Sequence, residues 1–527
     1  MIFGKHMNKY YIKYGGWILL GVVTLAAIDY AGLVIPNLYQ MVINGLGSGF
    51  VVVDGVRLPF DLDFLLDRVC MPMAAVILVV LVGQFLWRFC FAGSAIKVEA
   101  DLRNAMFDHA KDLSQQYYHV NKVGDLMSLF TNDLDTIQEC FSWGMLSFFD
   151  AIIQGGLAFF KMWGMNHTMT LLSLIPMVLL FCASTIVGRH MMEKWDARQA
   201  AFSKLSDFSQ ESFTGIAVIK AFVKEAKELL AFQELNKENE KANVAYTRSS
   251  VLLRITVTLL VESVICVIIG FGGFLVYQGT FNAGQLVEFI GYFSAIVWPI
   301  MAVSDLIDMT SRGMASLKRI SALLDAPLDI ADRPDVQPLK DVKGEIEFRN
   351  LTFRYPDGEY DTLKNVSFRI EAGENIGLVG RTGSGKTTVV DLILRTYNVP
   401  DGTIFVDGHD VNTVPIWDVR QAAAYVPQDN FLFSDTITRN IGFTTREPDP
   451  KAVQVAAQLA DVDGNIREFA EGYDTVLGER GVTVSGGQKQ RISIARALIK
   501  DAPILILDDS VSAVDTSTER AILGNLR

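Results

Sequence analysis

Cysteine is scarce in this sequence, with five copies among 527 residues. All five lie in or beside apolar runs and none forms a C-x-x-C pair, so we interpret them as packing thiols and expect neither a disulfide framework nor a cysteine metal site. They are Cys70, Cys90, Cys140, Cys182 and Cys266.

Basic residues are fewer than acidic residues. The chain has 47 Lys and Arg against 59 Asp and Glu, which gives a formal net charge of −12. It has no basic stripe with interleaved aromatic residues, which is the usual electrostatic footprint of a nucleic-acid interface. The composition therefore gives no support for nucleic-acid binding.

Apolar residues are abundant instead, at 50% of the chain, and the mean hydropathy is +0.27. An ordinary soluble protein needs less, so we expect part of the chain to lie in lipid. Lys5, Lys9 and Lys13 precede an apolar run at 17–38. The run is too long for a signal-peptide core and lacks a small-residue cleavage site. It predicts a first spanning helix with the N-terminus in the cytoplasm.

Five further apolar segments predict spanning helices, so that six spans return the chain to the cytoplasm. They lie near 71–96, 141–163, 169–189, 251–277 and 285–310. The short connections 165–168 and 278–284 carry no Lys or Arg, as expected outside the cell. The predicted fold of this half, 1–327, is an all-α six-helix transmembrane domain.

The long connections 97–140 and 190–250 are charged but keep helical spacing, which predicts that the spanning helices continue into the cytoplasm. About twenty residues of helix reach roughly 30 Å. Glycine breaks near 117–124 and 208–215 predict the two places where these helix pairs turn. The outside connection 44–68 is interpreted as a solvated loop with a small hairpin and no assigned function.

Ionisable residues inside predicted spans are candidates for function. Asp29 and Glu262 lie deepest and are candidates for lining a substrate cavity. Those near span ends are expected to reach water, as are Arg88, Lys161, Arg254 and Glu288. The remaining ones are Asp150, Asp305 and Asp308.

The chain becomes polar after the last span, and Pro334 and Pro338 predict a linker at 328–343. From 344 onward the apolar period changes to two, which predicts strands at 346–355 and 366–370. A second, α/β domain is therefore expected at 344–527.

A phosphate-loop motif, G-x-x-x-x-G-K-[ST], occurs within this domain without a mismatch. An apolar stretch at 375–379 predicts the strand before it, and 388–394 predicts the helix after it. Lys386 is expected to neutralise phosphate charge, and the Thr387 hydroxyl to hold Mg²⁺. The predicted nucleotide-binding residues here are Gly380, Arg381, Thr382, Gly383, Ser384, Gly385, Lys386, Thr387 and Thr388.

A second apolar strand, 503–508, ends at Asp508, the acid expected to hold Mg²⁺ through water. Between the two anchors, an S-G-G-Q sequence opens a predicted helix at 489–499. Its residues are Ser485, Gly486, Gly487 and Gln488.

The order of these motifs, with Tyr355, Gln428 and Asp515 beside them, resembles the nucleotide-binding domain of ABC transporters. The six-span half resembles the exporters of that superfamily, and in detail the chain is similar to one subunit of the heterodimeric bacterial multidrug exporters of the BmrC type. The resemblance covers nearly the whole chain.

The resemblance implies roles for several residues. Tyr355 would stack on adenine, although a buried core tyrosine is the alternative. Gln428 would link Mg²⁺ to the membrane half. The S-G-G-Q residues would bind the γ-phosphate held by an opposite subunit, so that two chains enclose two ATP molecules.

Two departures from the family pattern matter. The family's general base is a glutamate, but here the position is Asp509, which predicts a slow site and a heterodimer in which the partner's site is competent. The alternative is a homodimer in which aspartate suffices. The sequence also stops 18 residues after Asp509, before the family's switch histidine, and we expect a shortened sequence.

The sequence as a whole predicts a plasma-membrane subunit that uses ATP and Mg²⁺ to export amphipathic compounds, with a second half-transporter as partner. The alternatives are a non-hydrolysing ATP-binding subunit, or an exporter of lipids or peptides.

Overall fold

The computed structural model describes residues 3–53, 55–478, 481 and 483–526, without the side chains of 177, 179–190 and 304. The chain divides into two compact units. The first comprises Met1–Ala110 and Gly124–Asp325, and the second comprises Lys111–Val123 and Ala326–Arg527. A short segment from the first half of the sequence therefore packs with the second unit.

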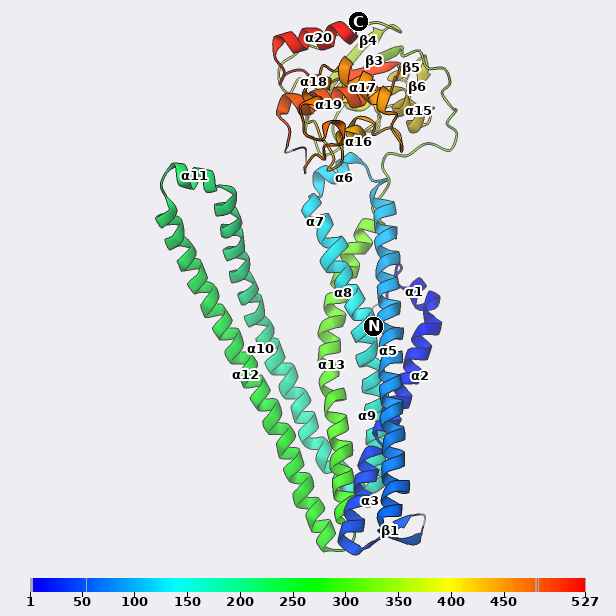
Figure 1. Cartoon of the computed structure of the whole chain (residues 1–527), viewed down its shortest axis with the longest axis vertical. Helices are drawn as coiled ribbons and strands as arrows, with labels where there is room; N and C mark the ends of the chain where they lie inside the picture. Colours follow the sequence, from blue (N-terminus) through cyan, green and yellow to red (C-terminus); the bar gives the residue numbers. More distant parts are fainter. Residues whose placement is uncertain (1–2, 54, 479–480, 482, 527) are drawn as a thin grey trace. The chain divides into compact units, whose positions relative to one another are not determined.

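The first unit is built almost entirely of helices (Figure 1). The described helices are α1 (Asn8–Lys13), α2 (Gly15–Gly32), α3 (Ile35–Ser48), α4 (Leu62–Phe64), α5 (Met71–Ala110), α7 (Val123–Ser128), α8 (Leu134–Glu139), α9 (Met145–Met165), α10 (His167–Thr214), α11 (Ile216–Ala221), α12 (Glu225–Tyr277) and α13 (Ala283–Leu324). Single π-helical turns occur at η1 (Leu65–Cys70), η2 (Leu129–Asp133) and η3 (Cys140–Gly144). The lengths of α5, α10, α12 and α13, at 40 to 53 residues, confirm that the spanning helices continue beyond a bilayer.

Five stretches of the described residues are long and apolar enough to span a membrane. They are Gly15–Ser48, Leu62–Ala110, Val123–Met165, Glu225–Tyr277 and Ala283–Leu324, and each contains one predicted span. The sixth predicted span, 169–189, falls on α10, where most of the side chains lie outside the described residues.

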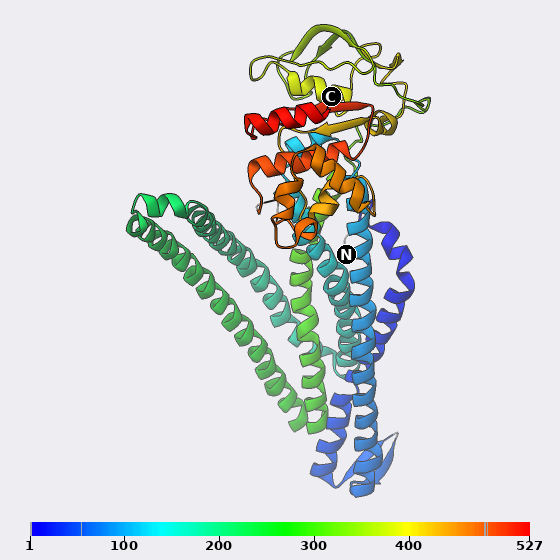
Figure 2. The same ribbon diagram turned by 45° about the horizontal axis from the view of Figure 1, so that its top comes forward.

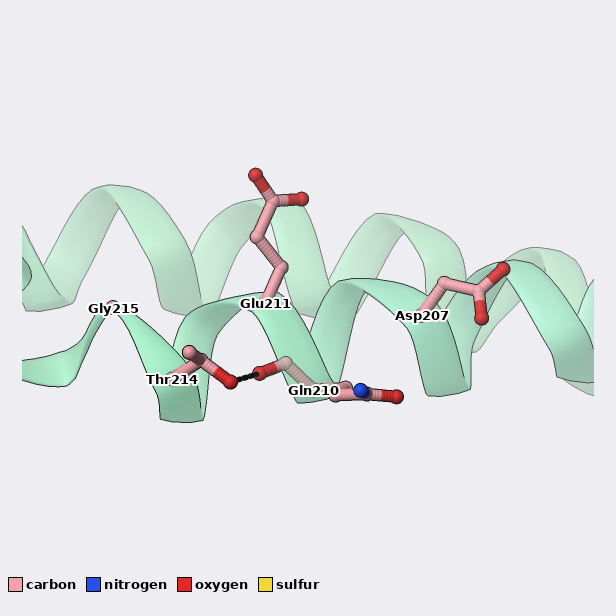
Figure 3. A pocket seen from close by; sticks show the side chains of 5 residues that line it. All are labelled: Asp207, Gln210, Glu211, Thr214 and Gly215. Atoms are coloured by element: carbon pink, nitrogen blue, oxygen red, sulfur yellow. Dashed lines mark hydrogen bonds between the residues drawn. The ribbon is translucent and has the colours of Figure 1, made fainter. Parts of the chain in front are cut away.

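Helices α10 and α12 run side by side in both views and are joined at one end by α11 (Figures 1 and 2). Helix α10 continues through most of the predicted turn and ends at Gly215, whose N–H donates to the Glu211 carbonyl at 2.8 Å. The Thr214 hydroxyl donates to the Gln210 carbonyl at 2.7 Å (Figure 3). This hydrogen bond satisfies a second carbonyl group near the end of the helix. An open hollow of about 540 Å³ lies along this turn and also contacts Asp207.

The predicted hairpin in the first outside connection is confirmed. Strand β1 (Phe50–Val53) pairs antiparallel with β2 (Val56–Pro59), with Val53 opposite Val56. Its turn residue Asp54 lies outside the described residues.

Two buried carboxylates join distant helices of this unit. Asp133, 1% exposed, accepts from the Ser316 hydroxyl at 2.6 Å and pairs with Arg319. Glu288 accepts from Asn37 at 3.1 Å and from the Tyr292 hydroxyl at 2.8 Å.

The expectation that Glu288 reaches water is therefore wrong, because its side chain is 6% exposed. Its hydrogen bonds to α3 and to its own helix take the place of water.

The second unit contains the mixed α/β elements expected from the sequence. They are α6 (Gln115–Val120), β3 (Ile346–Phe353), β4 (Leu363–Ile370), α14 (Lys386–Ile393), β5 (Ile404–Val406), β6 (His409–Asp410), α15 (Ile416–Gln421), β7 (Ala423–Val426), α16 (Ile437–Ile441), α17 (Pro450–Leu459), α18 (Asp463–Arg467), η4 (Gly472–Asp474), α19 (Gly486–Leu498), β8 (Ile504–Leu507) and α20 (Thr516–Leu526). One antiparallel sheet has the order β4-β3-β5-β6, and β7 pairs with β8 in parallel. The predicted strands at 346–355, 366–370 and 503–508 and both predicted helices are confirmed, with boundary shifts of a few residues.

The predicted strand 375–379 is wrong. This stretch has no strand conformation, and Val379 is 99% exposed. None of the strand pairings among the described residues includes it. An apolar pattern favours a strand, but a strand also needs a neighbouring backbone with free N–H and C=O groups, and the sequence does not show whether one is available.

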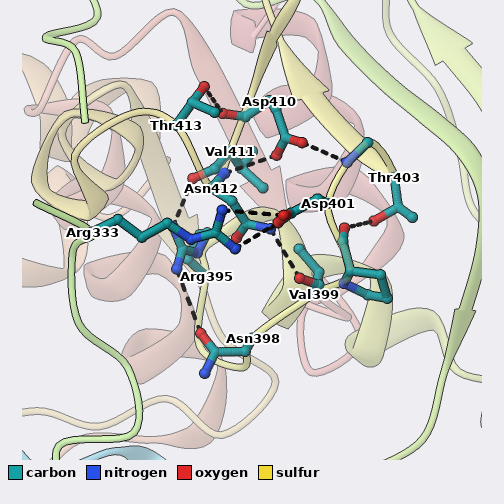
Figure 4. A network of polar contacts seen from close by, with 12 residues as sticks. Arg333, Arg395, Asn398, Val399, Asp401, Thr403, Asp410, Val411, Asn412 and Thr413 are labelled. Atoms are coloured by element: carbon teal, nitrogen blue, oxygen red, sulfur yellow. Dashed lines mark hydrogen bonds and ion pairs between the residues drawn. The ribbon is translucent and has the colours of Figure 1, made fainter. Parts of the chain in front are cut away.

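The connection after α13 lies against the second unit instead of hanging free. Arg333 forms a two-fold ion pair with Asp401 at 2.6 and 3.1 Å (Figure 4). Buried Asn412 donates to the same carboxylate at 2.7 Å and to the Val399 carbonyl at 2.9 Å. Further along, the Leu339 N–H donates to Asp418 at 2.9 Å. These contacts fix the start of the second unit.

We predict that Asn412→Ala lowers the free energy of unfolding of the second unit by about 1–3 kcal/mol, because it leaves the buried Val399 carbonyl without its donor. Arg333→Ala is the matched control on the other side of Asp401. Its ion pair is exposed, so its removal should cost less than about 1 kcal/mol. Thermal unfolding of the full chain in detergent measures both, and an equal loss in the two variants would contradict the prediction.

Candidate nucleotide site

The phosphate loop takes a conformation that requires glycine. Gly383 and Gly385 have φ angles of 79° and 90°, in the region that L side chains rarely adopt. A Cβ on Gly385 would also lie 2.7 Å from Leu363 Cδ2. Helix α14 begins directly after it at Lys386, so the helix N-terminus with its free N–H groups faces the loop. That end of a helix favours anions such as phosphate.

Lys386 reaches back across the loop that precedes it. Its ammonium donates to the carbonyls of Gly380 and Arg381 at 3.0 and 3.2 Å. The charge is thus held within the curl of the loop, where a phosphate oxygen could replace the carbonyl oxygens as acceptor. Thr387 is exposed next to it, and Thr388 is buried.

Tyr355 lies beside the loop, at the edge of the core. Its hydroxyl hydrogen-bonds the Thr388 hydroxyl at 2.8 Å, and its ring meets Phe353 and Tyr397 edge-on at 5.1 and 5.0 Å between centroids. The ring packs at the edge of the core of the sheet but remains partly exposed. Burial raises the pKa of Tyr355, so it stays neutral.

The parallel strands bring the two expected metal-side residues to one edge. Val426 of β7 lies opposite Leu507 of β8, and the Asp508 N–H donates to the Val426 carbonyl at 3.0 Å. Asp508 directly follows β8, whereas Gln428 comes two residues after the end of β7, and its side chain is exposed. The two residues therefore leave the sheet from neighbouring strand ends.

One oxygen of Asp508 suits a hydrated cation. Its Oδ2 atom is buried and has no hydrogen-bond partner among the described residues. Buried carboxylate oxygens normally have partners, and Mg²⁺ prefers oxygen ligands with retained water. No group of three or more His, Cys, Asp and Glu in the described chain could hold a metal alone. The residues fit Mg²⁺ only if the nucleotide supplies further ligands.

A second acid adds negative charge on the α14 side of this edge. Burial, and then the nearby Asp508 carboxylate, raise the pKa of Asp391 to about 6. At neutral pH Asp391 is mostly ionised, so a bound cation would offset its negative charge.

The S-G-G-Q residues form the N-terminus of α19. Ser485 and Gln488 make a reciprocal capping box, with distances of 3.3 and 2.9 Å. A Cβ on Gly487 would lie 2.9 Å from the Ala513 carbonyl, whereas Gly486 has open space. No hydrogen bond among the described residues joins this motif to the phosphate loop of the same chain.

The segment after Asp508 is held by a residue that sequence reasoning missed. Gln490 of α19 donates to the Asp509 carbonyl at 3.3 Å and accepts from the Ala513 N–H at 3.0 Å. The Ser512 hydroxyl also donates to the Asp509 carbonyl at 3.0 Å. Asp509 itself has a φ of 49° and an exposed side chain. Sequence pattern alone gives no signal for Gln490, because its role depends on a loop that is distant in the sequence.

Asp515 ends this loop as the cap of α20. Its carboxylate accepts from the backbone N–H groups of Ser517 and Thr518, each at 3.2 Å, and from the Ser517 hydroxyl. Hydrogen bonds from Ser517 and Thr518 hold the pKa of Asp515 well below its usual range. In this structure the carboxylate is therefore engaged within its own helix.

A second missed residue comes from the segment 111–123 that packs with this unit. His119 of α6 lies 3.4 Å from the Tyr397 hydroxyl, measured from its Nδ1 atom. Tyr397 in turn contacts Tyr355, so the turn predicted at 117–124 touches the aromatic group beside the phosphate loop.

Comparison with known proteins matches both units to one family. Residues 18–300 match the family model of the ABC transporter transmembrane region, and residues 363–512 match the ABC transporter family model. The chain is 33% identical over 525 residues to the probable multidrug resistance ABC transporter ATP-binding/permease protein YheI of Bacillus subtilis, covering 99% of this chain and 87% of that protein. It is 35% identical to the multidrug resistance-like ATP-binding protein MdlA of Escherichia coli, covering 90% and 81%.

Two further relatives extend the comparison. An ATP-dependent lipid A-core flippase of Syntrophus aciditrophicus is 33% identical, covering 81% of this chain and 70% of that protein. The solved structure of a bacterial Atm1-family ABC exporter with ATP bound shares the fold, with a TM-score of 0.75 at 24% identity over 99% of this chain and 89% of that chain. The chain is thus a multi-pass plasma-membrane protein with a cytoplasmic ATP-hydrolysing domain, and it belongs to the ABC transporter family as an exporter half that carries both domains on one polypeptide.

Proposed function

We propose that this chain is one subunit of a two-chain exporter that moves amphipathic compounds out of the cytoplasm or the inner leaflet, and that its own nucleotide site hydrolyses ATP slowly. The names of its relatives support the substrate class, because two concern multidrug resistance and one concerns a lipid A-core flippase. Substrate choice varies among proteins of one fold, so transport of lipids or peptides remains the alternative.

The slow site is proposed mainly because the backbone of Asp509 is held in place. An aspartate reaches about 1.5 Å less far than a glutamate, which is one carbon–carbon bond. A backbone shift could restore the reach, but Gln490 and Ser512 both hold the Asp509 carbonyl. A general base must lie within hydrogen-bond distance of the attacking water and contributes about 10²–10⁴ in rate. The site therefore binds ATP but activates water poorly.

The residues that we propose to bind ATP are unaffected by the shorter side chain of Asp509. The phosphate loop, the start of α14 and Lys386 would hold the phosphates, and Tyr355 would contact the adenine. Thr387, Gln428 and Asp508 would hold Mg²⁺, which supplies charge neutralisation of the phosphates when bound. Asp508 has the unpartnered buried oxygen that this role requires.

The partner is inferred from the S-G-G-Q residues, which lie apart from the phosphate loop in the pattern of hydrogen bonds. Ser485, Gly486, Gly487 and Gln488 have an ordered, capped arrangement, but none bonds the loop of the same chain. They would complete a site on a second half-transporter. If that partner has a glutamate after its strand acid, the pair has one slow and one competent site, which favours a heterodimer over a homodimer.

We predict that Lys386→Ala weakens ATP binding by about 10- to 150-fold, because a hydrogen bond to a charged group contributes about 1.5–3 kcal/mol. Lys451→Ala, on the exposed face of α17, is the control and should leave affinity unchanged. Equilibrium binding of a fluorescent ATP analogue to the purified full chain measures both. Equal affinities of the two variants would contradict the proposed phosphate site.

We predict that Asp509→Glu raises ATP turnover at this site by about 10- to 100-fold, since it restores part of a general base's contribution. Asp509→Asn keeps the length but removes the base, so it should not raise turnover. Single-turnover hydrolysis in the assembled transporter measures the change. The slow-site proposal fails if Asp509→Glu leaves both turnover and ATP retention unchanged.

A separate experiment distinguishes the exporter from a non-hydrolysing regulatory subunit. We expect ATP hydrolysis by the chain alone to be low and to rise when its partner half-transporter is added, because the S-G-G-Q residues then complete the partner's site. Lys386→Ala in this chain should leave part of the assembled activity, and mutation of its Ser485 should abolish most of it. Assembled activity that is insensitive to Ser485→Ala would contradict this arrangement.

A further inference from the structure

Two buried acidic residues lie on neighbouring helices inside the membrane unit. Asp29 lies on α2 and Asp150 on α9, and they are 6% and 8% exposed. Helix α9 packs against both α2 and α13, and the two carboxyl groups are close enough to interact electrostatically. Each residue lies near the middle of a predicted span, far from either bilayer surface. Ionisable groups at such a depth are costly and usually have a function.

The two carboxyl groups differ in their surroundings. The Trp298 indole of α13 lies close to the Asp150 carboxylate. The Oδ2 atom of Asp29, in contrast, is buried and has no hydrogen-bond partner among the described residues. An unpartnered buried carboxylate oxygen costs free energy, so a group that only holds the fold together would be expected to have a donor.

Glu288 shows what a structural carboxylate looks like in this unit. It has a similar exposure of 6%, but it accepts hydrogen bonds from Asn37 and Tyr292. Asp133 also has one buried oxygen without a partner, but its other oxygen has a hydroxyl donor and an ion pair, whereas none of the described residues donates a hydrogen bond to the Asp29 side chain.

The Trp298 side chain is the exposed part of this site. Trp298 is 55% exposed although its indole lies close to the buried Asp150, so it links the acids to the surface of the chain. The next residue, Pro299, has no N–H and leaves the Ala295 carbonyl without its usual helical donor. A Cβ on Gly155 of α9 would lie 3.4 Å from Pro299, so the two helices approach closely here.

We propose that Asp29, Asp150 and Trp298 form a recognition site for an organic cation within the membrane unit. The proposal rests on the export function proposed above and names the charge of the substrate. A lipophilic cation would place its charge beside the Asp29 oxygen and its apolar groups against the indole, whose face attracts cations. The site has only two carboxylates and no third ionisable ligand from the described residues, which does not suit a metal ion.

The test is equilibrium binding of tetraphenylphosphonium to the full chain in lipid nanodiscs, with empty nanodiscs subtracted. Tetraphenylborate has nearly the same shape and the opposite charge, so it is the matched ligand. We expect Asp29→Asn and Asp150→Asn each to weaken binding of the cation by about tenfold or more, because each removes a nearby negative charge in a low-dielectric site. Binding of the anion should be unchanged or tighter.

Glu288→Gln is the matched protein control, since it also removes a buried negative charge but keeps its hydrogen bonds. It should leave binding of tetraphenylphosphonium unchanged. Unchanged cation affinity in both aspartate variants, or an equal loss in Glu288→Gln, would overturn the proposed site. If Asp29→Asn does not fold, Asp150→Asn and Trp298→Leu decide the question by the same criterion.

Basal ATP hydrolysis of the same preparations separates this proposal from the proposed function. Normal hydrolysis together with unaltered cation binding in the variants would refute the cation site alone. Absence of ATP binding and hydrolysis in the wild-type assembly would refute the export function, while the binding comparison would still test the site.

Discussion

The nucleotide site depends on the parallel pairing of β7 with β8. This pairing joins Val426 to Asp508 through a backbone hydrogen bond, and it places the residues that follow the two strands at one edge. Helix α19 then ties the segment beyond Asp508 to itself through Gln490. The positions of Asp508, Asp509 and the S-G-G-Q helix are thus set by one connected group of contacts to the backbone.

The proposed slow site rests on this rigidity, because Asp509 is one methylene shorter than a glutamate. At a flexible loop, an aspartate could compensate for its shorter side chain by a small backbone movement. Here the carbonyl of Asp509 has two donors, and its backbone is already in the left-handed region, which is uncommon for residues other than glycine. Under the proposed function, a difference of one carbon–carbon bond would therefore become a difference in rate, while the binding of ATP by the phosphate loop would be unaffected.

Much of the architecture could be predicted from the sequence because its signals are local. Apolar length gave the spans, the glycines and Lys386 gave the phosphate loop, and Asp54-Gly55 gave the hairpin. The signals failed where the answer depends on distant partners. Residues 375–379 have a strand pattern but no strand neighbour, Glu288 finds donors on another helix, and Gln490 and His119 act on loops far away in the sequence. The roles of the individual site residues still rest on the family resemblance and on this geometry.

The membrane unit follows the same logic of satisfied and unsatisfied polar groups. Asp133 and Glu288 are buried and accept hydrogen bonds that hold helices together, although one oxygen of Asp133 is itself unpartnered, whereas Asp29 accepts none from the described residues. Glu262, the other deep acid, is exposed on α12. Because hydrocarbon does not tolerate a carboxylate, that face of α12 must be covered by protein or by a water-filled space. This requirement agrees with a two-chain assembly.

The most direct test of the central claim is the fate of the γ-phosphate of ATP bound to this chain. The assembled transporter would be allowed to turn over with 8-azido-ATP labelled on either the α- or the γ-phosphate, then cross-linked by light, and the label on this chain measured. The account predicts equal retention of the two labels, because the nucleotide stays a triphosphate. Retention of the α-label with loss of the γ-label would show that this site hydrolyses ATP readily and would contradict it.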